Sequence, residues 1–204
     1  MLNLNQELIH CRKCERLVKW REEVARTKKR AYFDWDYWGK PVPGFGDING
    51  EVMVVGLAPG AHGSNRTGRM FTGDSSGDFL YPALYRAGFA TQPNSTSLED
   101  GLKLHNIYIT AICRCVPPQN KPKPDEIRNC LPFLEQEIGL MQNLRVFVAL
   151  GAIAHHQLQK IYSSWLDRKL NFPFSHGNIE VIPERNIFLI SSYQIGRASC
   201  RERV

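Results

Sequence analysis

Residues 52–74 read VMVVGLAPGAHGSNRTGRMFTGD, an apolar run that passes directly into a glycine-rich loop. The apolar run is continuous rather than alternating, which is typical of a strand covered on both faces in a parallel sheet. Ligands of open α/β sheets bind beyond the carboxyl ends of such strands. This stretch therefore indicates the fold class, and it predicts a site in the loop that follows the strand.

Three more apolar runs follow: NIYITAI at 106–112, RVFVALG at 145–151 and NIFLISS at 186–192. Stretches with helical periodicity separate them, at 77–89, 124–138 and 151–166. Strands that alternate with helices predict an α/β domain of three layers, α/β/α, with a central four-stranded parallel sheet. Residues 28–50, rich in aromatic residues, proline and glycine, predict a long ordered loop.

The composition limits the class of protein. The chain has 204 residues, 43% hydrophobic and 23% charged, which is ordinary for a globular protein with one core. No apolar run approaches the roughly 18 residues of a membrane span, and the N-terminus has no signal-peptide pattern. We therefore expect a single cytoplasmic domain over 1–193 that is monomeric and does not enter a membrane. The formal charge of +6 favours an anionic partner, although residues 194–204 supply +2 of it.

Four of the six cysteines are arranged as one close pair and two distant positions: Cys11 and Cys14, then Cys115 and Cys130. In a chain without a secretory signal, cysteines favour metal or redox chemistry over disulfides. Four thiolates that converge in the fold suit an iron–sulfur cluster or a structural zinc ion. The alternative is that the cysteines are separate core residues, which is how we interpret Cys113.

The glycine-rich loop after the first strand is neither a Walker loop nor a G-x-G-x-x-G dinucleotide loop. Its glycines permit close approach of the backbone to a flat ligand, and Arg66 and Arg69 could meet phosphates. Lys28, Lys29 and Arg30 form a short basic run that could also touch phosphate, although such a run is usually a solvated face. The alternative is a loop with a purely structural role.

These motifs together resemble the uracil-DNA glycosylase superfamily, and most closely its iron–sulfur-containing fifth family. The matching stretches are GLAPGAHGSNRTGRMFTGD (56–74), YITAICRCVPPQNKPKPDEIRNC (108–130), HCRKCERL (10–17) and PVPGFGD (41–47). The long first motif with its Ala-His-Gly is specific for this branch, and the resemblance covers nearly everything up to Tyr193. It implies a monofunctional DNA glycosylase of base-excision repair, which flips deaminated bases out of single- or double-stranded DNA.

The resemblance also implies the roles of individual residues. A [4Fe-4S] cluster would be held by Cys11, Cys14, Cys115 and Cys130. Phe71 would stack on the flipped base. The implied base-binding residues are Gly56, Ala58, Pro59, Gly60, Ala61, His62, Phe71 and Ala111. The implied DNA-contacting residues are Asn65, Arg66 and Arg69.

Two departures from the better-known fourth family bear on the choice of substrate. That family carries an acid in its first motif, where residues 58–61 here are Ala-Pro-Gly-Ala, and an asparagine that reads uracil at the position of Ala111. Both departures match the fifth-family pattern. A pocket without that asparagine loses a discriminating hydrogen bond, so we expect it to accept several deaminated bases, uracil and hypoxanthine among them.

Cleavage of an N-glycosidic bond needs donors aimed at the departing base and an acceptor or anion near the sugar and the attacking water. Asp74 and Asn120 are our candidates for positioning that water. The alternatives are a helix-capping aspartate and a turn asparagine, and His62 either contacts the base or only fixes its own loop. We expect the cluster to be structural. The rival interpretations are a non-catalytic DNA-binding module with a four-cysteine metal site, and zinc in place of the cluster.

The pattern of the sequence changes after Tyr193. In the superfamily that the chain resembles, the last strand leads into a His-Pro-Ser loop that contacts the base, whereas this chain reads QIGRASCRERV over 194–204. That run looks like the translation of a sequencing adapter. We therefore expect that Gln194 stands at the position of the motif histidine and that residues 195–204 are not native. A domain over 1–193 without its C-terminal motif would flip and cleave bases poorly.

Overall fold

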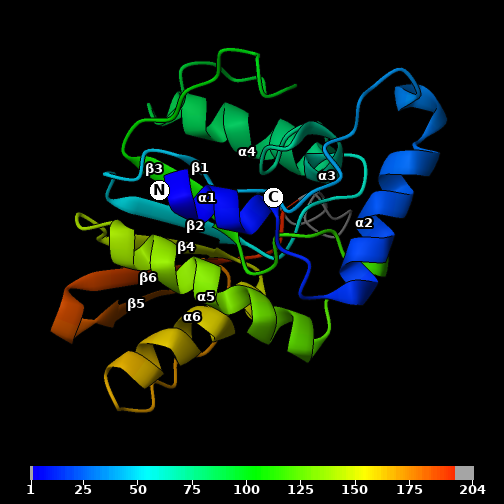
Figure 1. The fold of residues 1–204 in the computed structure, drawn as a ribbon. Coiled ribbons are helices and arrows are strands. Elements are labelled where there is room, and N and C mark those ends of the chain that lie inside the picture. The colour runs from blue at the N-terminus through cyan, green and yellow to red at the C-terminus, as the bar shows by residue number, and fades with distance from the viewer. Residues whose placement is uncertain (1, 196–204) are drawn as a thin grey trace.

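The structure, a computed structural model, describes residues 2–195, in which a mixed six-stranded sheet forms the middle layer (Figure 1). The strand order is β1-β3-β2-β4-β6-β5. The four inner strands run parallel to one another: β2 (Val52–Gly56), β3 (Ile107–Ala111), β4 (Val146–Leu150) and β6 (Ile187–Ser192). Each of them arises from one of the four apolar runs, so the predicted central parallel sheet is confirmed.

The two edge strands run antiparallel to their neighbours, and neither was predicted from the sequence. β1 (Phe45–Gly46) pairs with β3, and β5 (Ile179–Ile182) pairs with β6. β1 is only two residues long and lies within the predicted loop over 28–50. β5 lacks a continuous buried pattern, because Ile179 and Val181 remain 57% and 41% exposed at the edge of the sheet.

Helices cover both faces of the sheet and complete the three predicted layers. One face is covered by α4 (Ser75–Arg86), and the other by α5 (Pro124–Leu140) and α6 (Ala152–Trp165) (Figure 1). The core cluster beneath α4 contains Val54, Ile109, Leu80 and Leu84. The core cluster beneath α5 and α6 contains Met53, Phe147, Leu134 and Leu158. Neighbouring residues of β2 thus point into opposite layers, as a strand buried on both faces requires.

The remaining helices bring the N-terminal segment to the glycine-rich loop. α1 (Leu2–Ile9) packs against α5, and α2 (Glu15–Thr27) stands at one side of the molecule (Figure 1). α2 contacts α3 (Ser64–Thr67), a single turn within the glycine-rich loop. Three 3₁₀ turns complete the described elements: Arg30–Tyr32, Pro118–Asn120 and Pro183–Arg185.

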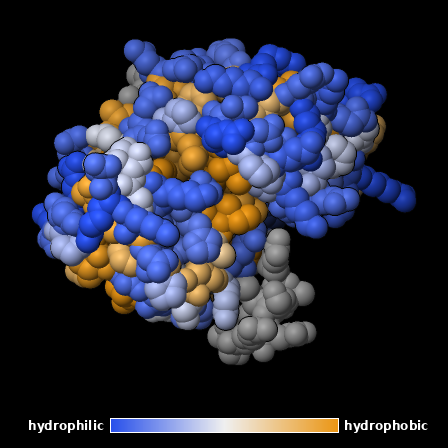
Figure 2. Space-filling model, turned by 90° about the horizontal axis from the view of Figure 1, so that it is seen from below, coloured by the Kyte–Doolittle hydropathy of each residue, from blue (hydrophilic) through white to orange (hydrophobic). Residues whose placement is uncertain are grey.

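The surface formed by α5 and α6 exposes apolar side chains among hydrophilic ones (Figure 2). A groove there is lined by Ile127, Leu131, Ile153 and Ile161. Within residues 2–195, no helix combines the length and the apolar character that crossing a membrane requires.

Candidate active site

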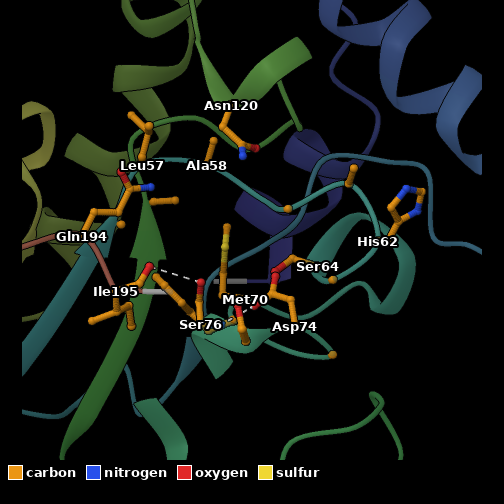
Figure 3. A pocket seen from close by; sticks show the side chains of 18 of the residues that line it. Leu57, Ala58, His62, Ser64, Met70, Asp74, Ser76, Asn120, Gln194 and Ile195 are labelled. Atoms are coloured by element: carbon orange, nitrogen blue, oxygen red, sulfur yellow. Dashed lines mark hydrogen bonds between the residues drawn. The ribbon is translucent and has the colours of Figure 1, made fainter. Parts of the chain in front are cut away.

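A cavity of about 460 Å³ opens at the carboxyl ends of the parallel strands (Figure 3). Each inner strand contributes to its wall at or just beyond its last residues: Gly56 of β2, Ala111 of β3, Leu150 of β4 and Gln194 after β6. Much of the remaining wall comes from the glycine-rich loop between β2 and α4. The cavity therefore lies at the edge of the sheet where ligands of open α/β sheets bind.

The cavity gathers most of the site residues predicted from the sequence. Those that line it are Gly56, Ala58, Gly60, Ala61, His62, Phe71, Asp74, Ala111 and Asn120. Pro59 is buried next to them and is not part of the wall. Asp74 and Asn120 approach the cavity from two separate segments, the start of α4 and the turn after β3 (Figure 3).

The Phe71 ring forms part of the wall and lies against the end of β2. A Cβ added to Gly56 would lie 2.6 Å from Phe71 Cζ, so only glycine leaves room for the ring. Phe71 has a φ of 51°, in the left-handed region that bulky residues rarely adopt. Such backbone strain costs on the order of 1–3 kcal/mol and persists where the surroundings impose it, often at functional sites. A ring held in this way offers a flat apolar surface to a ligand in the cavity.

Asp74 caps helix α4 and also faces the cavity. Its Oδ1 accepts hydrogen bonds from the backbone N–H groups of Ser76 (3.0 Å) and Gly77 (3.2 Å). Its Oδ2 points toward the glycine-rich loop, where a Cβ at Gly63 would lie 2.0 Å away. Burial raises the pKa of Asp74, and the two backbone hydrogen bonds oppose that rise only in part. The carboxyl group is thus both a helix cap and a titratable group beside the cavity.

Asn120 ends the 3₁₀ turn that follows β3, and the backbone of this turn is strained. Gln119 and Asn120 have φ values of 55° and 56°, two consecutive non-glycine residues in the left-handed region. Asparagine tolerates that region better than most residues. The Asn120 side chain points toward the cavity from across its opening, facing the side on which Asp74 lies (Figure 3).

His62 lies at the edge of the cavity, with its Nδ1 3.0 Å from the hydroxyl oxygen of Tyr37 (Figure 3). Burial lowers the pKa of His62, and the positive charges of Lys29 and Arg66 lower it further. The ring is therefore neutral near pH 7. Its contact with Tyr37 fastens the glycine-rich loop to the segment 28–50, which supports the loop-fixing role among the two alternatives.

Two of the three predicted DNA-contacting residues have interior partners that the sequence did not reveal. Asn65 is fully buried, and its Nδ2 donates to the backbone oxygen of Arg21 at 3.3 Å. Arg69 is also buried and forms a bidentate ion pair with Asp100, while its Nε donates to the Thr72 hydroxyl at 3.0 Å. These side chains hold the loop together from inside, so we leave them out of the proposed DNA-contacting surface.

Arg66, the third of these residues, lies between two aromatic rings of the segment 28–50. Its guanidinium carbon is 3.9 Å from the ring centre of Tyr32 and 4.1 Å from that of Trp35. Its Nε donates to the backbone oxygen of His62 at 2.7 Å, and its Nη2 donates to that of Gly73 at 3.1 Å. Arg66 therefore joins the aromatic segment to the glycine-rich loop, and we leave it out of the DNA-contacting surface too.

Several residues of the wall were not predicted as site residues, among them Lys29, Tyr32, Ser76, Leu150 and Ile195. The first two belong to the aromatic and basic stretch around 28–38, whose composition was the available signal. Leu150 ends a predicted strand. It could have been predicted as a site residue, because ligands of open α/β sheets bind beyond the carboxyl ends of the strands. Gln194, singled out because it follows the last strand, does line the cavity. Residues 196–204, predicted not to be native, lie outside the described part of the chain.

The four predicted metal ligands lie around one small cavity, just before α2, in the segment after β3 and in α5. Cys11, Cys14, Cys115 and Cys130 all line it. Cys113, interpreted as a core residue, is buried beneath α5 and α6. Within residues 2–195, no group of three or more His, Cys, Asp or Glu residues has an arrangement that could hold a single metal ion. In its chemistry, the set of four thiols fits a four-thiolate centre.

Hydrogen-bond donors lie next to two of these sulfur atoms. Arg21 Nη1 donates to Cys115 Sγ at 2.9 Å, and the backbone N–H of Arg114 donates to Cys130 Sγ at 3.3 Å. Burial raises the pKa of Cys115 to about 11 and that of Cys130 to about 12, while the nearby arginine in each case acts in the opposite direction. These two thiols are therefore protonated near pH 7, and the N–H donors lie where they would stabilise thiolates if a metal replaced the protons.

Comparison with known proteins identifies clear relatives. A family model described as the uracil DNA glycosylase superfamily matches residues 43–194. The chain is 50% identical to a type-5 uracil-DNA glycosylase of Thermus thermophilus, over 94% of this chain and 85% of that protein. It is 42% identical to a type-5 uracil-DNA glycosylase of Pyrobaculum aerophilum, over 91% and 78%. A type-4 uracil-DNA glycosylase of the same organism is 35% identical, over 61% and 56%. Among these relatives, identity is higher to the type-5 proteins.

Proposed function

Because the chain belongs to the uracil-DNA glycosylase superfamily, we propose that it hydrolyses the N-glycosidic bond of uracil in DNA, as a type-5 enzyme of base-excision repair. The observation that carries this proposal is the cavity at the strand ends, where Asp74 and Asn120 flank a wall made of Phe71 and small residues. Its volume of about 460 Å³ lies within the range of pockets that hold small ligands.

One part of the pocket wall, at the start of the glycine-rich loop and the end of β3, offers no polar side chain to a base. Ala58, Gly60 and Ala61 carry none, so their backbone groups are the donors and acceptors available in this part of the wall. Alanine at position 111 means that β3 presents no amide side chain. We infer that hypoxanthine is accepted as well as uracil, since residues 58–61 and Ala111 present no side-chain donor that either base would leave unpaired.

The mechanism begins with extrusion of the base, which costs a few kcal/mol and is easiest at a mispaired lesion. In the pocket, the Phe71 ring would stack on the base. Positive charge then builds on the sugar as the glycosidic bond breaks. The Asp74 carboxylate would stabilise that charge and, together with Asn120, orient the attacking water. The raised pKa of Asp74 makes it a better proton acceptor than an ordinary aspartate.

Cys11, Cys14, Cys115 and Cys130 would hold a [4Fe-4S] cluster. When bound, the cluster supplies a rigid covalent link rather than a redox step. The link would join the start of α2, the segment after β3 and α5, and so restrain the segment that continues from Ala111.

DNA would reach the pocket past Lys29 and Tyr32, which belong to its wall. Cations and aromatic rings are interleaved here: Lys29 Nζ lies 5.9 Å from the Tyr32 ring centre, and Lys28 Nζ lies 5.9 Å from that of Phe33. This combination suits a strand that presents phosphates and an unstacked base together. We propose a monomer that acts on deaminated bases in single- or double-stranded DNA in the cytoplasm.

A strand-scission assay tests the proposal. Duplexes that contain uracil or hypoxanthine are incubated with a version of the protein whose sequence after Tyr193 is taken from the source gene, and are then treated with alkali, which cuts at abasic sites. We expect cuts at both bases and none in matched undamaged duplexes. Asn120→Ala should lower the single-turnover rate by about 10²–10⁴-fold, the usual contribution of a group that handles the water's proton or position. Binding without scission would instead favour the alternative, a non-catalytic DNA-binding module.

The same assay examines the residues after Tyr193. Gln194 and Ile195 line the cavity, so their replacement changes its wall. A version whose sequence after Tyr193 is taken from the source gene should cleave faster than the chain as written. Equal rates would contradict the prediction that a motif histidine belongs at position 194.

A further inference from the structure

Two arginine side chains are buried against the four-cysteine cavity, and they differ in how their charges are balanced. Arg114 is fully buried and forms a bidentate ion pair with Glu137 of α5. Arg21 of α2 is only 2% exposed. Within residues 2–195 it forms no ion pair with a carboxylate. A buried arginine keeps its positive charge, and a buried charge without a counter-charge is strongly destabilising.

The hydrogen bonds of Arg21 indicate where its counter-charge belongs. Its Nη1 donates to Cys115 Sγ at 2.9 Å, and its Nη2 donates to the backbone oxygen of Cys11 at 3.2 Å. Its Nε is buried without any partner, as is the Nε of Arg114. In the described residues, four buried side-chain N or O atoms lack a partner, and these two belong to residues that line the four-cysteine cavity. A buried N–H without a partner needs an acceptor, and the cavity is where one can bind.

We propose that Arg21 is the counter-charge of a thiolate-bound metal centre in this cavity. An iron–sulfur cluster with four thiolate ligands carries net negative charge and has sulfide atoms that accept hydrogen bonds. Arg21 supplies the buried positive charge that balances this centre. The inference rests on the cluster proposed above, but it does not depend on glycosylase activity.

Arg21 also connects the metal centre to the base pocket. Its backbone oxygen accepts a hydrogen bond from Nδ2 of Asn65, which is fully buried. The backbone N–H of Asn65 donates to the oxygen of Gly60 at 3.0 Å, and Gly60 lines the pocket. A charge that fixes α2 at the centre therefore also fixes the glycine-rich loop. Arg21 is in this sense a positioning residue for the pocket.

Three variants test the charge. Arg21→Gln removes it, Arg21→Lys keeps it, and Arg26→Gln makes the same change at an exposed position of α2 whose partner is Glu23. Each protein is purified anaerobically, and iron and sulfide per chain and the midpoint reduction potential are measured. We expect Arg21→Gln to lose iron, and the cluster that remains to have a more negative potential, because loss of a nearby positive charge disfavours an added electron. Arg21→Lys should recover most of the iron, and Arg26→Gln should match the parent.

The outcomes separate a charge role from a packing role. Iron content and potential equal to the parent in Arg21→Gln would overturn the proposal. If circular dichroism shows that Arg21→Gln does not fold, the folding and iron content of Arg21→Lys become the test of the proposal. A folded, iron-loaded lysine variant supports the proposal, whereas an unfolded or iron-free one overturns it, because the shape of the guanidinium would then be what matters.

The connection to the pocket is measured by amide hydrogen exchange in the parent protein, with the cluster present and after its removal by a chelator. We expect faster exchange at residues 60–67 after removal, with β6 (187–192) as the internal reference. Unchanged exchange at 60–67 would overturn the connection. None of these measurements requires turnover, so a negative strand-scission assay would leave them fully interpretable.

Discussion

Asp74 performs two tasks with conflicting electrostatic requirements. As the cap of α4 it favours negative charge, because the N-terminus of a helix is electropositive. Beside the cavity, burial raises its pKa and so disfavours the same charge. A poorly solvated carboxylate is a strong proton acceptor and a strong partner for developing positive charge. In the proposed mechanism, the fold therefore gives up some stability at this residue for function.

Asp74→Asn should abolish most cleavage and leave the fold at least as stable as the parent. Asparagine still accepts the capping hydrogen bonds from Ser76 and Gly77, but it places no charge beside the cavity. The single-turnover rate should fall by about 10²–10⁴-fold. Urea denaturation should show the stability gain above the folded-state pKa of Asp74 and not at lower pH, where the parent carboxyl is protonated.

The pH profile provides a second test of Asp74. Because its pKa is raised, the parent rate should decline with falling pH at a value above the ordinary aspartate pKa of about 3.9. The residual rate of Asp74→Asn should lack this acidic limb. An unchanged limb in the variant would show that another group titrates.

Among the elements, the segment 28–38 between α2 and β1 is the one whose contribution to the pocket was hardest to predict from the sequence. Tyr32 lines the cavity, while its neighbour Phe33 is 67% exposed. A large aromatic side chain exposed beside a pocket and next to lysines is well placed to stack on a base. Arg66 and His62 attach the segment to the glycine-rich loop, so the position of the segment relative to the pocket is fixed.

Phe33→Ala should weaken DNA binding by about 1–3 kcal/mol, the value of one base–aromatic stack. Its stability should stay within about 0.5 kcal/mol of the parent, as expected for an exposed site. The matched control is Phe188→Ala, which removes a 40% exposed ring at the start of β6, the end of the sheet away from the cavity. Fluorescence anisotropy with a uracil duplex measures both, in an Asp74→Asn background that prevents turnover. Equal weakening in the two variants would contradict a stacking role for Phe33.

The elements that could be predicted from the sequence are those with their own local pattern. The four inner strands are continuous apolar runs, and α4, α5 and α6 show helical periodicity. Helix α2, with the sequence ERLVKWREEVART, is mostly polar, and its contacts lie far away in the chain.

The same contrast holds among the site residues. Glycine positions of the wall could be predicted, because glycine permits close approach of the backbone to a ligand, whereas the alanine positions followed from the resemblance to the family. The burial of Arg69 could not, because it depends on Asp100, 31 residues away. Burial of Arg66 likewise depends on rings from a different segment, Tyr32 and Trp35. A loop arginine is exposed unless such partners exist, and a local pattern cannot show them.

At the scale of the whole molecule, two buried ion pairs of residues 2–195 lie on opposite sides of the sheet. Arg69 pairs with Asp100 on the α4 side, and Arg114 pairs with Glu137 on the α5 side. Loss of one partner of such a pair is costly, because the other charge is left buried. Each arginine also adjoins a functional position: Arg69 precedes Phe71 by two residues, and Arg114 precedes Cys115. The two pairs thus fix the pocket and the metal site from opposite sides of the sheet.

Asp100→Asn should destabilise the protein at pH 7 by about 3–5 kcal/mol, because Arg69 loses its counter-charge. Burial alone would raise the pKa of Asp100, but hydrogen bonds from Arg69 and backbone N–H groups outweigh it and lower the pKa. The pair therefore stabilises the parent above pH about 4 and loses this effect as pH falls through the lowered pKa. Urea denaturation at pH 7 and at lower pH measures this. The control, Asp78→Asn, changes an exposed residue of α4; a destabilisation of similar size in both variants would contradict the explanation.

The pocket wall also has an evolutionary consequence. The broad substrate range proposed for this pocket can be narrowed, since a larger residue at Ala58, Ala61 or Ala111 would remove space or add a hydrogen bond. Gly56 and Gly63 cannot be replaced by a larger residue in this way, because a Cβ would collide with Phe71 at Gly56 and with Asp74 at Gly63. Specialists could thus descend from such a generalist by one substitution at any of three alanines, with the catalytic groups unchanged.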